Sequence, residues 1–424
     1  MTDLLQELQW RDMVYDQTEG LAEALGREKV TAYIGFDPTA SSLHVGSLLP
    51  VMALARLQRF GHTPIAIVGG GTGMIGGPSG KSQERQLLSN DQIEANVAGL
   101  RQQLSRFLDF DAPLNPARIV NNGEWLAAID LLSFLRDAGK HFTVNYMLQK
   151  ESVNRRLESE EGISFTEFSY LLLQAYDFLQ LFDRYQCVLQ MGGSDQWGNI
   201  TAGIDLIRKL RAKKSHGLVM PLVTTAAGVK FGKTEVGTVW LDPQRTSPFK
   251  FYQFWLNTDD RDVVPYLKFF TFLERETIEQ LSAQAAAAPA QREAQRALAR
   301  EVTRLVHGTE EVGRAERASA VLFGEDITTL PVEDVLAVFA DVPSTELSRA
   351  EFDGDGVGLV DLIARTKLAS SRSEARRLVQ GGGVYLNNRR LADPQSRLRQ
   401  GDAIGGTLFV LRKGSKETHL VRLT

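Results

Sequence analysis

The first half of the chain alternates between two patterns of hydrophobic and polar positions. Short apolar runs indicate buried strands, as in KVTAYIGF (29–36), TPIAIVGG (63–70) and RYQCVLQMGG (184–193). Between them, SLLPVMALARLQRF and ITAGIDLIRKL have the spacing of amphipathic helices. This alternation predicts an α/β fold with a Rossmann-like parallel sheet and helices on its faces.

Three polar segments follow the predicted strands. They are GFDPTASSLHVGSL (35–48), the glycine-rich 69–82 and GGSDQWGN (192–199). Ligands of parallel sheets bind beyond the C-terminal ends of the strands. We therefore expect the three segments to share one rim of one sheet.

Further along, the pattern changes twice. From about Tyr266 it becomes helical and alanine-rich, whereas 343–356 has no clear period and many turn formers. We predict a catalytic domain with an inserted helical segment (1–225), a helical domain that begins with a lysine-containing loop (226–342), a linker (343–356) and a small α+β domain (357–424).

Composition narrows the protein class. The 424 residues are 43% hydrophobic and 24% charged, enough for two or three globular domains. No apolar run reaches the roughly 18 residues of a membrane span, and the start, MTDLLQELQWRDM, has no signal-peptide pattern. We expect a soluble cytoplasmic protein. Cys187 is the only cysteine, and the six histidines have no ligand spacing, so no protein-bound metal is expected.

Charge is unevenly distributed. The chain carries a formal −4, yet residues 356–424 contain thirteen Lys or Arg against five Asp or Glu. A basic module on an acidic body is typical of a phosphate-rich partner, although a solvated basic face has the same composition.

The glycine stretch GGGTGMIGGPSGKS (69–82) overlaps two nucleotide-binding signatures and completes neither. Gly71, Gly73 and Gly76 match GxGxxG, but the Gly-Gly-Pro that follows is poor material for the first turn of a helix. The P-loop pattern ending at Lys81 is one residue short. A flexible turn is the alternative interpretation.

Two other segments carry stronger signals. In 35–48, Gly46 removes a side chain beside His44 and Ser47, which lets backbone approach a nucleotide. AAGVKFGKTE (226–235) places two lysines and a threonine among glycines, which suits a transient polyanion.

Together these segments resemble a known family. HVGS resembles the HIGH signature and KFGKT the KMSKS signature of class I aminoacyl-tRNA synthetases. With LLLQAYDFL and GGSDQWGNITAGIDLIRK, the whole chain resembles bacterial tyrosyl-tRNA synthetases, and its basic end resembles their S4-type RNA-binding domain. The resemblance implies that tyrosine is activated with ATP and transferred to the terminal ribose of tRNA, with Mg²⁺ accompanying ATP, no prosthetic group and a homodimer.

The same resemblance assigns site residues. Contacts to ATP phosphates and pyrophosphate fall to His44, Ser47, Thr39, Lys230, Lys233 and Thr234. Contacts to the nucleoside are assigned to Asp37, Gly46, Gly193 and Asp195, although Asp195 could instead cap a helix. Contacts to tyrosine are assigned to Tyr33, Gly35, Tyr170, Gln174, Asp177 and Gln196. Among these, Tyr33 and Asp177 would meet the phenol hydroxyl, and Tyr170 and Gln174 the amino group. Tyr170 and Tyr176 could otherwise be core aromatics.

The glycine stretch also resembles a family segment, GGxTGxIGDPSGK, in which Lys81 and Arg85 would face phosphate or tRNA. Here Gly77 replaces the aspartate expected near the substrate ammonium, and Ser47 replaces the last histidine of HIGH. In the basic end, Arg372, Arg376 and Arg377 would grip successive phosphates.

Several alternatives remain at the level of sequence. They are an RNA-binding protein on a synthetase-like scaffold, a dinucleotide or P-loop enzyme, and a tryptophan-specific synthetase. The apolar, aromatic segment 126–148 is the candidate dimer interface.

Overall fold

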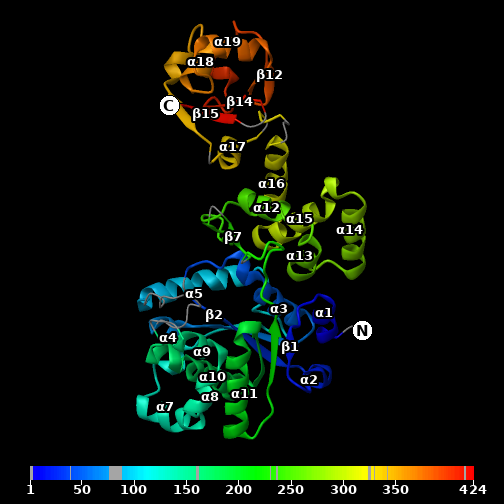
Figure 1. Cartoon of the computed structure of the whole chain (residues 1–424), viewed down its shortest axis with the longest axis vertical. Helices are drawn as coiled ribbons and strands as arrows, with labels where there is room; N and C mark the ends of the chain where they lie inside the picture. Colours follow the sequence, from blue (N-terminus) through cyan, green and yellow to red (C-terminus); the bar gives the residue numbers. More distant parts are fainter. Residues whose placement is uncertain are drawn as a thin grey trace. The chain divides into compact units, whose positions relative to one another are not determined.

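The computed structural model describes most of the chain. The described residues are 3–38, 40–75, 88–158, 162–229, 231–234, 237–322, 326–328, 330–340, 342–414 and 417–424, with the backbone alone for Glu151, Ser152, Arg155, Lys233 and Thr234. Two compact units are present, one of residues 1–245 with 257–306 and one of residues 246–256 with 307–424. Figure 1 draws the elements of both units, coloured along the sequence.

The first unit is built on a six-stranded sheet with the order β1-β6-β5-β2-β3-β4. Its strands are β1 Asp16–Gln17, β2 Thr31–Phe36, β3 Thr63–Val68, β4 Arg118–Asn121, β5 Cys187–Gly193 and β6 His216–Met220. All neighbours pair in parallel except β1 with β6. The predicted parallel sheet is therefore confirmed, and an antiparallel edge strand is added to it.

The helices of the first unit precede, connect and follow its strands. They are α1 Leu4–Trp10, α2 Leu21–Arg27, α3 Leu48–Arg59, α4 Gly70–Met74, α5 Asn90–Leu104, α6 Gly123–Leu126, α7 Leu131–Asp137, α8 Val144–Leu148, α9 Glu151–Leu157, α10 Phe165–Tyr185, α11 Trp197–Arg211, α13 Val263–Phe270, α14 Arg275–Ala287 and α15 Glu293–His307. A short hairpin, β7 Lys233–Thr234 and β8 Gly237–Thr238, follows β6.

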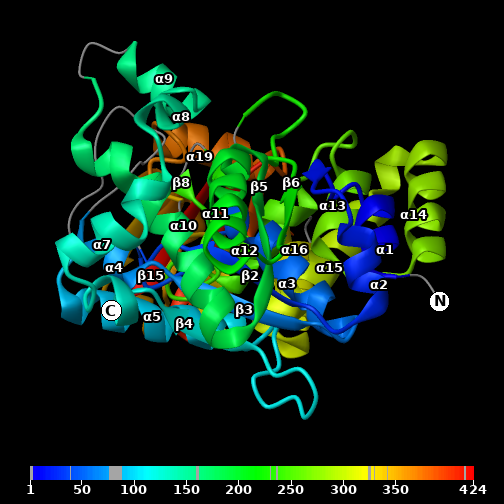
Figure 2. The ribbon, with the colours of Figure 1, turned by 90° about the horizontal axis from the view of Figure 1, so that it is seen from below.

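Helix α10 positions much of the site. It begins after Ser164, whose hydroxyl accepts a hydrogen bond from the Glu167 amide (3.1 Å), and it ends at Gln186 in the left-handed region (φ 54°). Its apolar stripe, including Leu171, Ala175 and Phe178, packs with α11 and with Tyr33 and Ile65 from the sheet. Helices α10 and α11 lie side by side in front of the sheet (Figure 2).

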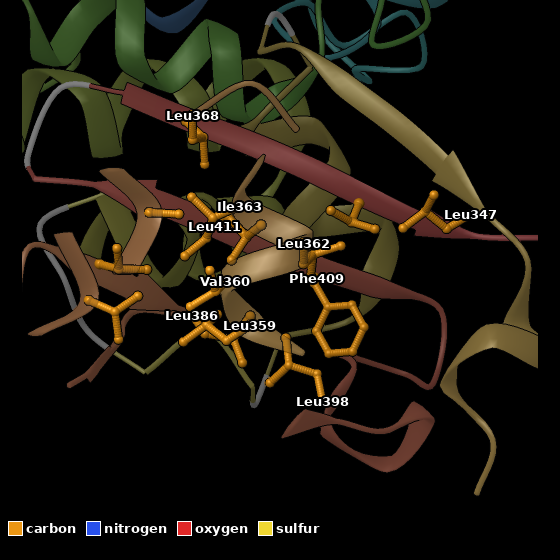
Figure 3. Packing of buried hydrophobic residues seen from close by; sticks show 14 of the residues in the cluster. Leu347, Leu359, Val360, Leu362, Ile363, Leu368, Leu386, Leu398, Phe409 and Leu411 are labelled. Atoms are coloured by element: carbon orange, nitrogen blue, oxygen red, sulfur yellow. The ribbon is translucent and has the colours of Figure 1, made fainter. Parts of the chain in front are cut away.

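The second unit combines helices with a mixed sheet. Its helices are α12 Pro248–Leu256, α16 Thr309–Leu322, α17 Val332–Val338, α18 Leu359–Arg365 and α19 Arg372–Gln380. Its strands are β9 Ser344–Leu347, β10 Val357–Gly358, β11 Val384–Leu386, β12 Arg389–Leu391, β13 Arg397–Leu398, β14 Leu408–Lys413 and β15 Glu417–Leu423. Figure 3 shows Leu362 and Ile363 of α18 packed against Phe409 and Leu411 of β14.

Residues 343–356 differ from the predicted linker. Strand β9 pairs in parallel with β15 at the edge of the five-stranded sheet, and the Phe352 side chain is 1% exposed. The strand is too short to show a period in the sequence, which is why the segment looked irregular. None of the helices in the described part of the chain has the length and apolar character of a membrane span.

Candidate active site

The candidate site lies where the order of the parallel strands reverses. Chain order runs β2-β3-β4 in one direction across the sheet and β5-β6 in the other, so β2 and β5 flank the switch point. Crevices at such points bind ligands at the C-terminal ends of the strands. The segments after β2 and β5 are 35–48 and 192–199, as the sequence predicts.

Tyr33 lies on β2 beneath this rim and is 1% exposed. Its ring contacts the Phe178 ring edge-on, with centroids 5.3 Å apart. Within the described part of the chain, the buried Tyr33 hydroxyl has no hydrogen-bond partner. Burial raises the pKa of Tyr33 well above its ordinary value, and the charge of the nearby Asp177 carboxylate adds to this rise. Tyr33 and Asp177 thus lie close together beneath the rim.

Asp177 lies on α10 and is 5% exposed. Its carboxylate accepts hydrogen bonds from Asn122 Nδ2 (3.0 Å) and Trp125 Nε1 (2.7 Å). Burial raises the pKa of Asp177 to about 7, although both donors act to lower it. With this pKa, the Asp177 side chain is present both as a neutral carboxyl and as a carboxylate near neutral pH. Strongly shifted pKa values of this kind are concentrated at functional sites.

Sequence reasoning missed the residues that surround this pair. Asn122 and Trp125 follow β4 in NNGEWL, where an asparagine resembles a turn former and a tryptophan a core residue. Gln190 on β5 was missed as well. It is the parallel partner of Tyr33 in the sheet, it is 3% exposed, and its side-chain oxygen has no partner among the described residues. A polar residue inside an apolar strand was the available signal.

Three side-chain amides of α10, α11 and the turn after β5 bind one another. Gln174 of α10 donates to Gln196 (3.3 Å), and Asn199 of α11 donates to both Gln174 (3.0 Å) and Gln196 (3.1 Å). Tyr170, one helical turn before Gln174, is half-buried. The structure therefore brings together the predicted Gln174 and Gln196 and adds Asn199. Tyr176, in contrast, packs on Phe134 with centroids 5.7 Å apart.

The HVGS segment forms a tight turn. His44 precedes a 3₁₀ turn, Val45–Ser47, and its Nδ1 accepts a hydrogen bond from the Gly46 amide (3.0 Å). Because Nδ1 accepts, the proton of the neutral imidazole lies on Nε2, which is then the donor. A side chain on Gly46 would meet the His44 ring at 2.8 Å. The half-buried Ser47 follows, and its amide donates to the His44 carbonyl (2.8 Å).

The KFGKT segment contacts this turn directly. Gly232 has φ +83°, and a side chain there would meet Val45 Cγ2 at 2.8 Å and the Gly46 amide nitrogen at 3.2 Å. Two backbone hydrogen bonds connect the segments, from Val45 to Val239 (3.0 Å) and from Val239 to Gly232 (3.3 Å). Lys230 and Thr39 lie outside the described residues, as do the side chains of Lys233 and Thr234.

Small residues and carboxylates line the ends of β2 and β5. A side chain on Gly193 would meet Asp195 Oδ1 at 2.6 Å, and one on Gly69 would meet Asp37 Oδ1 at 3.7 Å. Gly35, near the end of β2, is exposed, and among the described residues a side chain there would meet only Ile67 Cγ2, at 3.7 Å. The alternative interpretation of Asp195 as a helix cap is wrong, because neither the 3₁₀ turn Ser194–Gln196 nor α11 has a side-chain cap.

The start of the glycine stretch also differs from expectation. A short helix, α4, does begin directly after β3. The Gly71 amide donates to Asn122 Oδ1 (2.8 Å), and a side chain on Gly70 would meet Asn121 Oδ1 at 2.1 Å. The Asn122 oxygen thus binds an amide at the start of α4, where a dinucleotide fold would bind phosphate. Gly77, Lys81 and Arg85 lie outside the described residues.

In the second unit, α19 exposes Arg372, Arg376 and Arg377. The Arg372 guanidinium forms an ion pair with Asp361 (2.8 Å). The structure therefore leaves the helix with a basic exposed face, and one of its three arginines is partly neutralised.

Comparison with known families covers both units. The family described as tRNA synthetases class I (W and Y) matches residues 25–324, and the one described as tyrosine–tRNA ligase SYY-like C-terminal domain matches residues 334–421. The tyrosine–tRNA ligase of Roseiflexus castenholzii is 57% identical and that of Geobacillus stearothermophilus 52%. The first comparison covers 100% of both chains and the second 99% of both.

Solved structures agree with this assignment. A C-terminally truncated mitochondrial tyrosyl-tRNA synthetase of Aspergillus nidulans superposes with a TM-score of 0.69 at 31% identity, over 76% of this chain and 95% of that one. A tryptophanyl-tRNA synthetase of Plasmodium falciparum shares the fold at 15% identity, with a TM-score of 0.52 over 78% of this chain and 87% of its own. On its sequence, its fold and the residues at its strand switch point, the chain belongs to the class I tRNA synthetases, among the tyrosine–tRNA ligases.

Proposed function

We propose that this protein is a tyrosine–tRNA ligase that activates L-tyrosine with ATP and then transfers the tyrosyl group to the 3′-terminal ribose of tRNA(Tyr). The observation that carries the proposal is the buried Tyr33 hydroxyl, which has no partner among the described residues and lies near the Asp177 carboxylate. A phenol O–H can donate to Asp177 and accept from Tyr33, whereas an indole N–H only donates and phenylalanine does neither. Each partner left unpaired costs about 1–3 kcal/mol.

The first step requires positioning more than acid–base chemistry. The substrate carboxylate is already ionised at neutral pH, so one of its oxygens attacks the α-phosphorus, the bond to the β-phosphate oxygen breaks, and pyrophosphate leaves. Charge that develops on the phosphates needs donors in place. We assign this role to His44 Nε2–H and, from the sequence, to Ser47, Thr39, Lys230, Lys233 and Thr234. Mg²⁺ would accompany ATP, held mainly by phosphate oxygens and water.

The remaining site residues orient the two substrates. We assign the ribose to Asp195, with Gly193 allowing close approach, and the adenosine side of the rim to Asp37 and Gly46. The substrate ammonium would meet Tyr170 and the amide cluster of Gln174 and Gln196. These amides take more of that contact because Gly77 stands where the family has aspartate. Gly35 gives the substrate backbone access to the end of β2.

Recognition of tRNA belongs to the basic segments. We assign the exposed Arg372, Arg376 and Arg377 to phosphate contacts, together with Lys81 and Arg85 from the sequence. We also infer a homodimer. Helix α7 has no buried residue, and its Leu131 and Leu132 are 70% and 77% exposed. An apolar patch of this kind on the segment 126–148 is typical of a subunit interface. The proposed location is the cytoplasm.

Amino-acid-dependent exchange of pyrophosphate into ATP tests the proposal. Tyrosine should support exchange, whereas phenylalanine and tryptophan at equal concentration should not. Asp177→Ala should lose tyrosine affinity, and Lys233→Ala should lose rate with tyrosine affinity preserved. Exchange that depends on tryptophan, or tRNA binding without any exchange, would each contradict the assignment.

A further inference from the structure

Residues 222–229, which lead into KFGKT, and Phe231 within it are attached to helix α13. The Ala226 amide donates to the carboxylate of Asp262 (3.0 Å), directly before α13, and the Tyr266 hydroxyl donates to the Thr224 carbonyl (3.3 Å). The Phe231 ring stacks on Phe270 with centroids 5.2 Å apart and an interplanar angle of 11°. It also meets the Tyr266 ring edge-on at 5.0 Å. The position of Phe231 therefore depends on the position of α13.

Two buried arginines hold the C-terminal end of α13. Arg56 is 2% exposed and donates to the carbonyls of Phe269 (3.0 Å), Lys268 (3.0 Å) and Thr271 (2.6 Å). Arg11 is 3% exposed and donates to Lys268 (3.1 Å), Thr271 (3.2 Å) and Leu273 (2.8 Å). These carbonyls have no partner within the helix, and cations are favoured at this end of it.

This arrangement is costly for the stability of the fold. Burial, and next the charge of Arg11, lowers the pKa of Arg56 well below its ordinary value. Glu7, which pairs with Arg11, is the carboxylate that counteracts this effect. An apolar contact between α3 and α13 would avoid the desolvation of two guanidinium groups. What the arginines add is fixed geometry, because a planar fork that binds several carbonyls defines both distance and angle.

Arg56 also connects the HVGS segment with the KFGKT segment. It lies on α3, which begins directly after the His44 turn. Gly232 packs against that same turn through Val45 and Gly46. One helix thus carries the HVGS segment at its start and, near its end, the side chain that fixes the support of the KFGKT segment.

We propose that Arg56, assisted by Arg11, is a positioning residue that sets the KFGKT segment against the His44 turn by holding the end of α13. The proposal rests on the function assigned above. The Arg56 guanidinium is buried and donates to main-chain carbonyls, so we assign it no direct contact with substrate. A displacement of about 1 Å in such a support can cost on the order of a hundredfold in rate.

The test separates ATP use from tyrosine binding. In Arg56→Met, kcat/KM for ATP in pyrophosphate exchange should fall about tenfold or more, and the KM for tyrosine should stay within about twofold of wild type. For Arg56→Lys, kcat/KM for ATP should lie between the values of the wild type and Arg56→Met, because an ammonium group lacks the planar fork that binds three carbonyls. Arg59→Met is the matched control. It lies on the same helix, is exposed, and stacks on the Phe272 ring at 3.4 Å.

A double-mutant cycle shows whether Arg56 acts through Phe231. If it does, adding Arg56→Met to Phe231→Leu lowers the rate little further, whereas independent effects multiply. Multiplying effects, a parallel loss of tyrosine affinity, or an Arg56→Met rate equal to that of Arg59→Met would overturn the proposal. If Arg56→Met does not fold, Arg56→Lys and Arg11→Lys are judged by the same criteria. Absence of exchange in the wild-type protein would instead refute the proposed function.

Discussion

At the scale of single residues, Asp177 is held between two opposing influences. Burial favours the neutral carboxyl group, and the donors Asn122 and Trp125 favour the ionised one. The outcome is a pKa of about 7 in the unliganded protein, which places a change of charge within the working pH range. The substrate phenol needs the ionised form, because a carboxylate accepts its hydrogen bond more strongly than a neutral carboxyl does.

Tyrosine use should therefore depend on pH. Since the folded pKa is raised, Asp177 is protonated below about pH 7 and ionised above it. We expect kcat/KM for tyrosine to reach a plateau above pH 7 and to fall by up to about tenfold per pH unit below it. Exchange assays from pH 5.5 to 8.5 measure this profile. A profile that is flat, or identical in Asp177→Asn, would rule out this carboxylate as the titrating group.

Removing one donor should move that profile. Trp125→Phe keeps an aromatic ring but removes the 2.7 Å hydrogen bond that lowers the pKa of Asp177. The midpoint should shift to higher pH, and activity at pH 8.5 should recover most of the loss seen at pH 7. Leu114→Ala is the control, because this leucine is 79% exposed and its substitution should leave the pH profile unchanged. A shift to lower pH would contradict the assignment.

At the scale of elements, strand ends and tight turns determine how closely two segments approach. Gly232 and Gly228 both have positive φ, +83° and +77°. Among the described residues, Val45 and Gly46 fill the space around Gly232, whereas none lies within 4 Å of a side chain placed on Gly228. A side chain would therefore strain the backbone at both positions, but only at Gly232 would it also disturb a close contact between two segments.

Gly232→Ala should therefore impair catalysis more than Gly228→Ala. Both variants pay the penalty of a left-handed alanine, about 1–2 kcal/mol. Only Gly232→Ala also pushes the KFGKT segment off the His44 turn, so its exchange rate should be about tenfold or more below that of Gly228→Ala. Melting temperatures verify that the strain is comparable. Equal rates for the two variants would show that the contact with Val45 has no role.

Helix α19 makes a separate prediction about RNA. Arg376→Gln with Arg377→Gln should weaken tRNA binding and reduce the salt dependence of its affinity, because fewer counterions are released. Pyrophosphate exchange without tRNA should not change. Arg365→Gln, in the same unit, is the control, since its guanidinium is held by Glu351 at 2.7 Å. Loss of binding in the control alone would move the RNA contact away from α19.

At the scale of the whole molecule, the exposed leucines of α7 predict self-association. Leu131→Glu with Leu132→Glu should give a monomer, because two charges would have to be buried in an apolar interface. Analytical ultracentrifugation of the variant and the wild type measures the mass directly. Leu114→Glu is the matched control and should leave the assembly unchanged. A wild-type protein that sediments as a monomer at micromolar concentration would refute the inference.

Much of this protein follows from its sequence alone. Alternating strand and helix patterns predict the parallel sheet, and the polar segments that follow the strands predict the rim, because both are local properties of the chain. Tyr33, Asp177, His44, Gln174 and Gln196 are predicted on a different ground, because each lies within a segment that resembles the synthetase family.

Other features exist only in the folded molecule. Asn122, Trp125 and Gln190 are ordinary residues of a turn and a strand until the sheet brings them to Asp177 and Tyr33. Strand β9 needs its partner β15, more than seventy residues away, before it can be recognised. The spacing of apolar residues along a segment predicts only which face of that helix or strand is buried. Which polar groups then meet, and how far each pKa moves, depends on contacts between distant segments, and these the tertiary structure alone decides.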